Sequence, residues 1–378
     1  MISVVNIEKI RDQFPITKKK IYLNHAGTSP LCKPVAEAMQ AYLAKRIMQE
    51  ESEFELEDCR RLFAGLVNAQ LDEIALIPNT STGMNIAANM LQYPSGSNIV
   101  TTDLEFPSVV YPWLRSQMKS KVEIRYVRNV DGCLRQQDYE KAVDDKTVAV
   151  VVSHVEYSNG FRNNLRALAE ITHEHGAVLI VDACQSAGAL KIDVKSQGID
   201  LLATSTYKWL LGPSGAGFLF VREELAAGAE PVFVGWASVN HELFKTVDLW
   251  ENRELKLVDT AVRFETGTPS ILSYVGAAAA LKFIMEIGVE NIEKRIMDLT
   301  GHLIERLRQE GFKLQTLEQP EHRSGIVNVK TENPVEKVEN LQRKNIAVSA
   351  RMNGIRVSPH FYNTEEELEK FIAELKSL

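Results

Sequence analysis

The chain has 378 residues, of which 45% are hydrophobic and 25% charged, and 43 basic against 50 acidic side chains give it a formal net charge of −7. This composition is typical of a globular protein with a sizeable core and excludes disordered and low-complexity proteins. The acidic balance, without any basic block, argues against nucleic acid as a partner. No apolar run is long enough to span a bilayer, and the charged N-terminus is unlike a signal peptide, so no membrane partner is expected either.

The cysteines are few and far apart. Cys32, Cys59, Cys133 and Cys184 form no C-x-x-C pair. This spacing excludes a disulfide scaffold and a clustered zinc site, so no metal is expected. Unpaired cysteines suit a reducing compartment, and we expect the protein to be cytoplasmic.

Short apolar runs alternate with amphipathic stretches between residues 73 and 220. Two of the runs are almost continuously hydrophobic, as in strands covered on both faces, which requires parallel pairing with helical crossovers. The predicted strands are 73–78, 98–102, 122–127, 147–154, 177–183 and 200–205, and the predicted helices between them are 82–91, 109–119 and 165–175. This alternation predicts an α/β fold with a mostly parallel, doubly wound sheet.

The pattern changes after Pro269. Residues 271–310 are largely helical in pattern, with apolar side chains repeating every three or four positions. Short strands are predicted near 325–329 and 355–358, and a capping box opens the last helix. We therefore predict a large α/β domain at 15–265 and a smaller α+β domain made of 1–14 and 266–378.

A segment rich in hydroxyl groups, residues 78–85, lies between a predicted strand and a predicted helix. Hydroxyl groups and free backbone N–H groups at a helix start can bind an anion. An ordinary helix N-cap is the commoner explanation of such a segment when it stands alone.

Two later strands end in side chains that can act on a ligand. The first ends in Asp182, with Gln185 three residues on, and the second leads through Ser205 and Tyr207 to Lys208 and a glycine-rich turn. Ligands bind at the carboxyl ends of strands in doubly wound sheets. The glycines also suggest a nicotinamide dehydrogenase, but that fingerprint follows the first strand and opens a helix, whereas here the glycines come late and precede a strand.

The order D-x-x-Q, S-x-Y-K and G-P-x-G resembles the class V aminotransferase family of fold-type I pyridoxal-phosphate enzymes, over residues 22–363. That family also contains cysteine desulfurases, isopenicillin N epimerase, kynureninase and C–S lyases. The resemblance implies the fold-type I architecture and pyridoxal 5′-phosphate as cofactor. It makes Lys208 the catalytic amine that binds the cofactor and Asp182 the catalytic carboxylate at the pyridine nitrogen.

The resemblance also implies a set of cofactor contacts. These are Thr80, Ser81, Thr82, Phe106, Asp182, Gln185, Ser205, Tyr207, Lys208, Gly267 and Thr268. In the family, the counterparts of Gly267 and Thr268 reach the phosphate of the neighbouring subunit, which implies a homodimer with shared active sites. Phe106 stands where desulfurases have a histidine; its ring can stack on the cofactor but cannot transfer a proton.

Substrate contacts follow from the same resemblance. Arg356 matches the arginine that holds the α-carboxylate, a task suited to the planar guanidinium fork. Asn24 and His25 match the substrate-side segment near the N-terminus. Arg351 is interpreted as a structural or secondary contact. His154 could be a catalytic base, but a hydrogen-bonded histidine at a strand end is at least as common, so it is given no catalytic role.

The cysteine positions bear on the reaction. Desulfurases carry sulfur on a cysteine in the loop before the substrate arginine, whereas the last cysteine here is Cys184. A persulfide-forming desulfurase is therefore disfavoured. We expect an enzyme acting on the α-amino group of an amino acid, foremost an aminotransferase. The alternative is a β-eliminating C–S lyase or a desulfurase-like enzyme without the persulfide cysteine. A non-catalytic protein that kept the fold is disfavoured by the presence of Lys208, Asp182 and Arg356 together.

Overall fold

A seven-stranded sheet forms the centre of the molecule. The computed structural model describes residues 7–50, 54–240 and 255–378. The sheet consists of β2 (Ile74–Ile77), β3 (Asn98–Thr102), β4 (Glu123–Val127), β5 (Thr147–Ser153), β6 (Val178–Asp182), β7 (Leu201–Ser205) and β8 (Gly217–Val221). Its strand order is β2-β8-β7-β6-β5-β3-β4, with β8 antiparallel to both neighbours and the other four neighbouring pairs parallel. The predicted mostly parallel α/β fold is confirmed.

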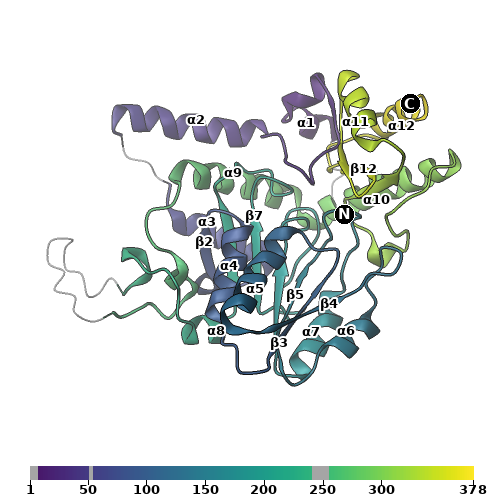
Figure 1. Ribbon diagram of the computed structural model, residues 1–378. Coiled ribbons are helices and arrows are strands. Elements are labelled where there is room, and N and C mark those ends of the chain that lie inside the picture. Colours follow the sequence, from purple (N-terminus) through teal and green to yellow (C-terminus); the bar gives the residue numbers. More distant parts are fainter. Residues whose placement is uncertain (1–6, 51–53, 241–254) are drawn as a thin grey trace.

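Helices cover both faces of this sheet (Figure 1). One face carries α4 (Thr80–Met90), α5 (Pro107–Ser120) and α8 (Glu223–Gly228). The other carries α3 (Leu56–Val67), α6 (Gln136–Ala142), α7 (Leu165–Glu174) and α9 (Ile271–Ile287). Successive residues of a strand enter opposite cores, as Ile74 and Ala75 do. Both faces of the strands are buried, which is why their sequences are continuously hydrophobic rather than alternating.

The predicted helical stretch 271–310 is two helices. α9 is followed by α10 (Val289–Gln309), and the pair is bent by 78°. Gly288 joins them with φ 87°, a backbone conformation that glycine adopts without strain. α2 (Lys33–Met48) packs along α9 (Figure 1). In the part of the chain described, no single helix is long and apolar enough to cross a membrane, although α9 and α10 meet the length and composition criteria as a bent pair.

The C-terminal part has its own sheet and core. Its elements are β9 (Val327–Lys330), α11 (Pro334–Arg343), β10 (Ile346–Ala347), β11 (Ser349–Arg351), β12 (Gly354–Val357) and α12 (Glu365–Lys376). The antiparallel sheet has the order β11-β12-β9, and β10 pairs in parallel with β1 (Ile21–Tyr22). Short 3-10 helices complete the chain: η1 (Pro15–Lys18), η2 (Leu71–Glu73), η3 (Trp236–Ser238), η5 (Ala261–Phe264) and η6 (Pro320–His322).

The division into domains at 15–265, and at 1–14 with 266–378, stays a prediction. Parts of both ranges, 1–6 and 241–254, lie outside the described residues. The side chains of α9 share the core of the large sheet, whereas Leu23 and Leu299 share the core of the C-terminal sheet.

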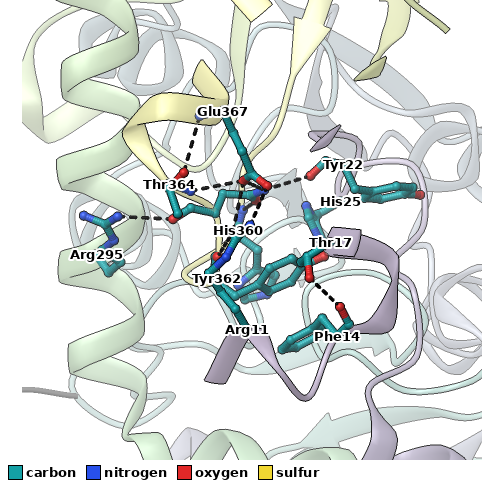
Figure 2. A network of polar contacts seen from close by, with 11 residues as sticks. Arg11, Phe14, Thr17, Tyr22, His25, Arg295, His360, Tyr362, Thr364 and Glu367 are labelled. Carbon is teal, nitrogen blue, oxygen red and sulfur yellow. Dashed lines mark hydrogen bonds and ion pairs between the residues drawn. The ribbon is translucent and has the colours of Figure 1, made fainter. Parts of the chain in front are cut away.

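A polar network joins the two ends of the chain (Figure 2). Arg11, the last residue of α1 (Ile7–Arg11), donates to the Tyr362 carbonyl at 2.6 Å and to the Glu367 carboxylate at 2.8 Å. Glu367 also accepts the Thr364 backbone N–H, while the Thr364 hydroxyl accepts the Glu367 N–H. This is the predicted capping box, and it is confirmed. The network fixes the N-terminal segment, which leads into residues 24–27, against the C-terminal helix.

Gly83 allows α4 to approach the sheet closely, and this yields a first prediction. A Cβ at Gly83 would lie 2.6 Å from the Ala203 Cβ and 2.9 Å from the Ile77 Cδ1. We expect Gly83→Ala to lower the free energy of unfolding by about 1–3 kcal/mol, because the packed helix must move. Denaturant unfolding of both proteins measures the difference.

Gly65→Ala in α3 is the matched control. Its Cβ would meet only the flexible Met285 methyl at 3.6 Å. We expect this variant to be stabilised by about 0.5–1 kcal/mol, because alanine favours a helix over the unfolded chain. Equal stability changes in the two variants would contradict the close approach of α4.

Candidate active site

One pocket gathers most of the side chains that the sequence singles out. It lies where β5, β6 and β7 reach their carboxyl ends, beside the start of α4, and we call it the strand-end pocket. Eight predicted contacts line it: Thr80, Ser81, Phe106, Asp182, Gln185, Ser205, Tyr207 and Lys208. Its other lining residues, Asn79, Ser108, Ser153, Tyr157 and Cys184, were not predicted as contacts.

Asp182 is the buried carboxyl of this pocket. Its side chain ends β6 and is 6% exposed, and one oxygen accepts the Cys184 backbone N–H at 2.7 Å. Burial raises the pKa of Asp182 to about 6, opposed by that hydrogen bond and by the positive charge of Lys208. No ion pair joins Asp182 to a cation among the described residues. The carboxyl can therefore accept a positively charged ligand atom.

Lys208 follows β7 and projects between aromatic rings. Its Nζ lies 5.7 Å from the ring centroids of both Phe106 and Tyr207. Burial lowers the pKa of Lys208, but the nearby Cys184, Tyr207 and Asp182 outweigh that effect, and the pKa is raised overall. An amine beside a buried carboxyl and a stacking ring is the group needed to hold an aldehyde covalently.

The hydroxyl cluster forms an anion cradle at the start of α4. Ser205 accepts the Thr80 backbone N–H at 2.8 Å, and its hydroxyl lies 2.8 Å from the Thr80 hydroxyl. The Ser81 hydroxyl donates to the Ser108 hydroxyl at 2.8 Å. Thr82 points elsewhere, since its N–H and hydroxyl both donate to the Asn79 side chain, which caps the helix. The helix cap at Asn79 thus lies beside the hydroxyl groups that are predicted to bind an anion, and the anion site stays a prediction.

Gln185 holds the N-terminal segment against the pocket. Its amide nitrogen donates to the Ala26 carbonyl at 3.0 Å, and its carbonyl accepts the Trp209 indole N–H at 2.8 Å. Asn24 and His25 do not line the strand-end pocket, although both lie in this segment.

His25 is part of the core. Its Nδ1 lies 2.8 Å from the Ser358 carbonyl. Its Nε2 lies 2.7 Å from the hydroxyl of Tyr362, which Figure 2 draws close to His25. Burial lowers the pKa of His25 to about 4, so the ring is neutral and both nitrogens are engaged. Asn24 differs, because its buried Oδ1 has no hydrogen-bond partner in the part of the chain that the structure describes.

Arg356 is a buried cation in the middle of β12. Its side chain donates to the Tyr157 carbonyl at 2.7 Å and to the Ser349 hydroxyl at 3.2 Å, and the residue is 2% exposed. Burial, followed by the charge of Arg351, lowers the pKa of Arg356 to about 9. Its positive charge also acts on Lys208. A buried guanidinium with only neutral partners among the described residues is suited to bind an anion.

Gly267 and Thr268 lie in another pocket, which shares only Ser81 with the strand-end pocket. Val232 and Phe233 line it too, and they are 58% and 74% exposed. In one chain, therefore, these residues are not brought together with Asp182 and Lys208.

Two acids that were not predicted accompany the pocket, the half-buried Glu105 and the buried Glu156. The Glu105 carboxylate accepts the backbone N–H and the hydroxyl of Ser153, each at 2.6 Å, and burial raises its pKa to about 8. Glu156 is fully buried, and one of its carboxyl oxygens has no hydrogen-bond partner among the described residues. Glu105 follows the buried strand β3 and Glu156 follows the buried strand β5, and the end of a buried strand is the same sequence signal that identified Asp182. Burial lowers the pKa of His154 to about 3, so this histidine is neutral.

The four cysteines lie in different parts of the fold. Cys32 and Cys59 are buried at or within helices, and Cys133 lies in a turn. Cys184 lines the floor of the strand-end pocket next to Asp182. Within the described ranges, no cluster of three histidine, cysteine or acidic side chains could hold a metal ion.

The comparisons with known proteins agree with this geometry. Residues 21–371 match the family described as Aminotransferase class-V. An "Uncharacterized aminotransferase YcbU" of Bacillus subtilis is 34% identical over 375 residues, 97% of each chain. A "Probable cysteine desulfurase" of Pyrococcus abyssi is 32% identical over 402 residues, covering 98% of this chain and 97% of the relative. The apo structure of a cysteine desulfurase from Thermococcus onnurineus NA1 is 29% identical, with a TM-score of 0.89 over 100% of this chain and 99% of that one.

The pocket fits the cofactor of that family. Lys208 can hold the aldehyde, the hydroxyl cradle can hold a phosphate, and Asp182 can pair with a ring nitrogen. Fold, pocket and sequence similarity over nearly the whole chain lead to one conclusion: the chain belongs to the class V aminotransferase family and is an enzyme that depends on pyridoxal 5′-phosphate.

Proposed function

We propose that this enzyme is an aminotransferase, which moves the α-amino group of an amino acid to an oxo acid. The observation that carries the proposal is that Lys208 is the only basic side chain among the described residues lining the strand-end pocket. Lys208 as a single base can take the proton from the substrate Cα onto its Nζ. It can then return that proton to a different carbon of the same reacting system, on the same face. Transamination needs no further acid or base.

The other residues bind and orient. When bound, pyridoxal 5′-phosphate supplies an electron sink for the negative charge that develops at the substrate Cα. Asp182 would pair with the ring nitrogen and keep it protonated, and the Thr80 and Ser205 hydroxyl groups at the start of α4 would hold the phosphate. Arg356 binds the substrate α-carboxylate, because the guanidinium is buried and has only neutral partners among the described residues. Phe106 stacks on the ring and transfers no proton.

The second candidate is β-elimination from a sulfur-containing amino acid. It is favoured by the similarity to proteins named cysteine desulfurases. Lys208 would remove the same proton, and a leaving group on the β-carbon would depart instead of the proton returning. The tight turn at Met352 and Asn353, before Arg356, carries no thiol, so the sulfur would leave as free sulfide.

A homodimer completes the proposal. The pocket lined by Gly267 and Thr268 is flanked by exposed apolar side chains, Val232 and Phe233. Such side chains are commonly covered by another subunit. In the dimer, Gly267 and Thr268 of one subunit would contact the phosphate in the other, which makes the active sites shared.

Product analysis distinguishes the two reactions. With a panel of amino acids we expect an oxo acid from the donor, and a new amino acid only when an oxo-acid acceptor is added. Mass spectrometry measures both products. We expect Lys208→Ala to abolish them, because the base is lost.

Cysteine serves as the diagnostic donor. If cysteine yields ammonia, pyruvate and free sulfide in the absence of an oxo-acid acceptor, the main reaction is β-elimination and not transamination. A persulfide trapped on Cys184 or any other cysteine would restore the desulfurase interpretation.

We expect Asp182→Asn to lower the catalytic rate but to raise the stability of the cofactor-free protein. We expect kcat to fall by about 10²–10³ with little change in KM, because the lost charge acts mainly on the developing transition state. The cofactor-free variant should be more stable than cofactor-free wild type above pH 6, by up to about 3 kcal/mol. The reason is that folding raises the pKa of Asp182 from 3.8 to about 6, so ionisation destabilises the folded protein as pH rises through that range. Unfolding curves from pH 4 to 8 measure the gap, which should close near pH 4.

Asp144→Asn is the control of opposite sign. Hydrogen bonding to Arg125 lowers the pKa of Asp144, so its ionised form stabilises the fold at neutral pH. That variant should be destabilised at pH 7 and approach wild type in acid.

A change in KM alone for Asp182→Asn would show that this carboxyl does not face the ring nitrogen.

The dimer predicts linkage between cofactor and assembly. A ligand bound by both subunits shifts dissociation to lower protein concentration. We expect sedimentation on dilution to show a tighter dimer with pyridoxal 5′-phosphate than without it, and Thr268→Ala to weaken both assembly and cofactor affinity. A monomer that binds the cofactor as tightly as the dimer contradicts the shared site.

A further inference from the structure

The β11–β12 hairpin carries two arginines on one face. In its register Ser349 lies opposite Arg356, and Arg351 lies opposite Gly354. The Arg356 Nε donates to the Ser349 hydroxyl at 3.2 Å, so the Ser349 side chain is on the same face as Arg356. Side chains alternate along a strand, which places Arg351 on that face as well.

The two guanidinium groups are close enough to share a ligand. Diagonal neighbours on paired strands lie about 7–8 Å apart, within reach of long side chains. The charge of Arg351 contributes to lowering the pKa of Arg356, which places the two charges within electrostatic range. Because Met352 and Asn353 close the hairpin in left-handed conformations, the strands are held in this register up to Arg351.

Neither positive charge is neutralised by the described part of the chain. Arg356 donates only to the Tyr157 carbonyl and the Ser349 hydroxyl. The exposed Arg351 donates to the Ala350 carbonyl, and no described carboxylate forms an ion pair with it. Two unpaired cations on one face repel each other, and a ligand with two negative charges relieves that repulsion.

The position of the pair fixes which part of a substrate it meets. Tyr157 lines the strand-end pocket and its carbonyl holds Arg356, so Arg356 is adjacent to the reacting end of the substrate. Arg351 is exposed and next to the hairpin turn. A substrate held by Arg356 at its α-carboxylate has the Arg351 guanidinium on the same face of the hairpin, one diagonal position away.

Resting on the proposed role of Arg356, we propose that Arg351 binds a second carboxylate at the far end of the substrate. The enzyme thereby selects short dicarboxylic amino acids and oxo acids over their neutral analogues. The buried Arg356 supplies most of the affinity, and the exposed Arg351 supplies the discrimination. A guanidinium is suited to this because it binds a carboxylate in two-point geometry.

Binding of unreactive ligands tests this without catalysis. Calorimetry on the cofactor-loaded enzyme compares glutarate with glutaramate, in which an amide replaces one carboxylate at nearly the same shape. We expect wild type to bind glutarate roughly tenfold more tightly. Arg351→Gln should reduce the ratio to about two or less, and 0.5 M salt should reduce it in wild type, because Arg351 is exposed.

Arg343→Gln is the matched control. It removes the same charge from an exposed position on α11 in the same part of the chain, and should leave the ratio unchanged. Arg351→Lys should retain part of the preference. Unchanged thermal midpoints establish that the variants are folded. Equal binding of the two ligands by wild type, or an equal loss in the Arg351→Gln and Arg343→Gln variants, overturns the proposal.

Turnover supplies the second comparison. The kcat/KM ratio for glutamate over glutamine should fall in Arg351→Gln by the same factor as the binding ratio. If no amino acid is transaminated but the preference for binding glutarate still requires Arg351, the proposed reaction is wrong and the second carboxylate site is supported. If amino acids are transaminated but the kcat/KM ratio of glutamate over glutamine is the same in wild type and Arg351→Gln, the site is wrong and the proposed reaction is supported.

Discussion

The buried carboxyl of Asp182 is the constraint on which the active site depends. A carboxyl at the end of a central strand, with one backbone hydrogen bond and a pKa raised by burial to about 6, is unfavourable as an isolated anion. In the proposed role of Asp182, the ring nitrogen of the cofactor would supply the positive charge that offsets this cost.

The rest of the pocket follows from placing the cofactor against that carboxyl. Asp182, Phe106 and Lys208 line the pocket together and would hold the ring and the aldehyde of the cofactor. The hydroxyl groups at the start of α4 would hold its phosphate. Gly83 sets the position of these hydroxyl groups, because the absence of a side chain lets α4 pack directly on β7 and brings Thr80 to Ser205.

Charge of the opposite sign comes from the C-terminal sheet. Arg356 is buried among neutral partners, and Arg351 lies beside it on the same hairpin. The hairpin is short, and a two-residue turn leaves no room for a loop that could carry a thiol over the substrate. The same tight turn sets the spacing between the arginines. In the proposed function, the length of this turn therefore links the reaction type to the choice of substrate.

The sequence by itself determined the sheet, its two-sided burial and the order of Asp182 and Lys208 along it, because these depend on local hydrophobic pattern and residue type. It also predicted the capping box at Thr364, a contact within one helical turn. Only the tertiary structure decided that His25 lies in the core, that Gly267 and Thr268 occupy a separate pocket, and that Glu105 and Tyr157 join the site. The structure also shows that the predicted helical stretch 271–310 is two helices that meet at Gly288. Burial and hydrogen-bond partners are set by segments far apart in the chain, so no local pattern can specify them.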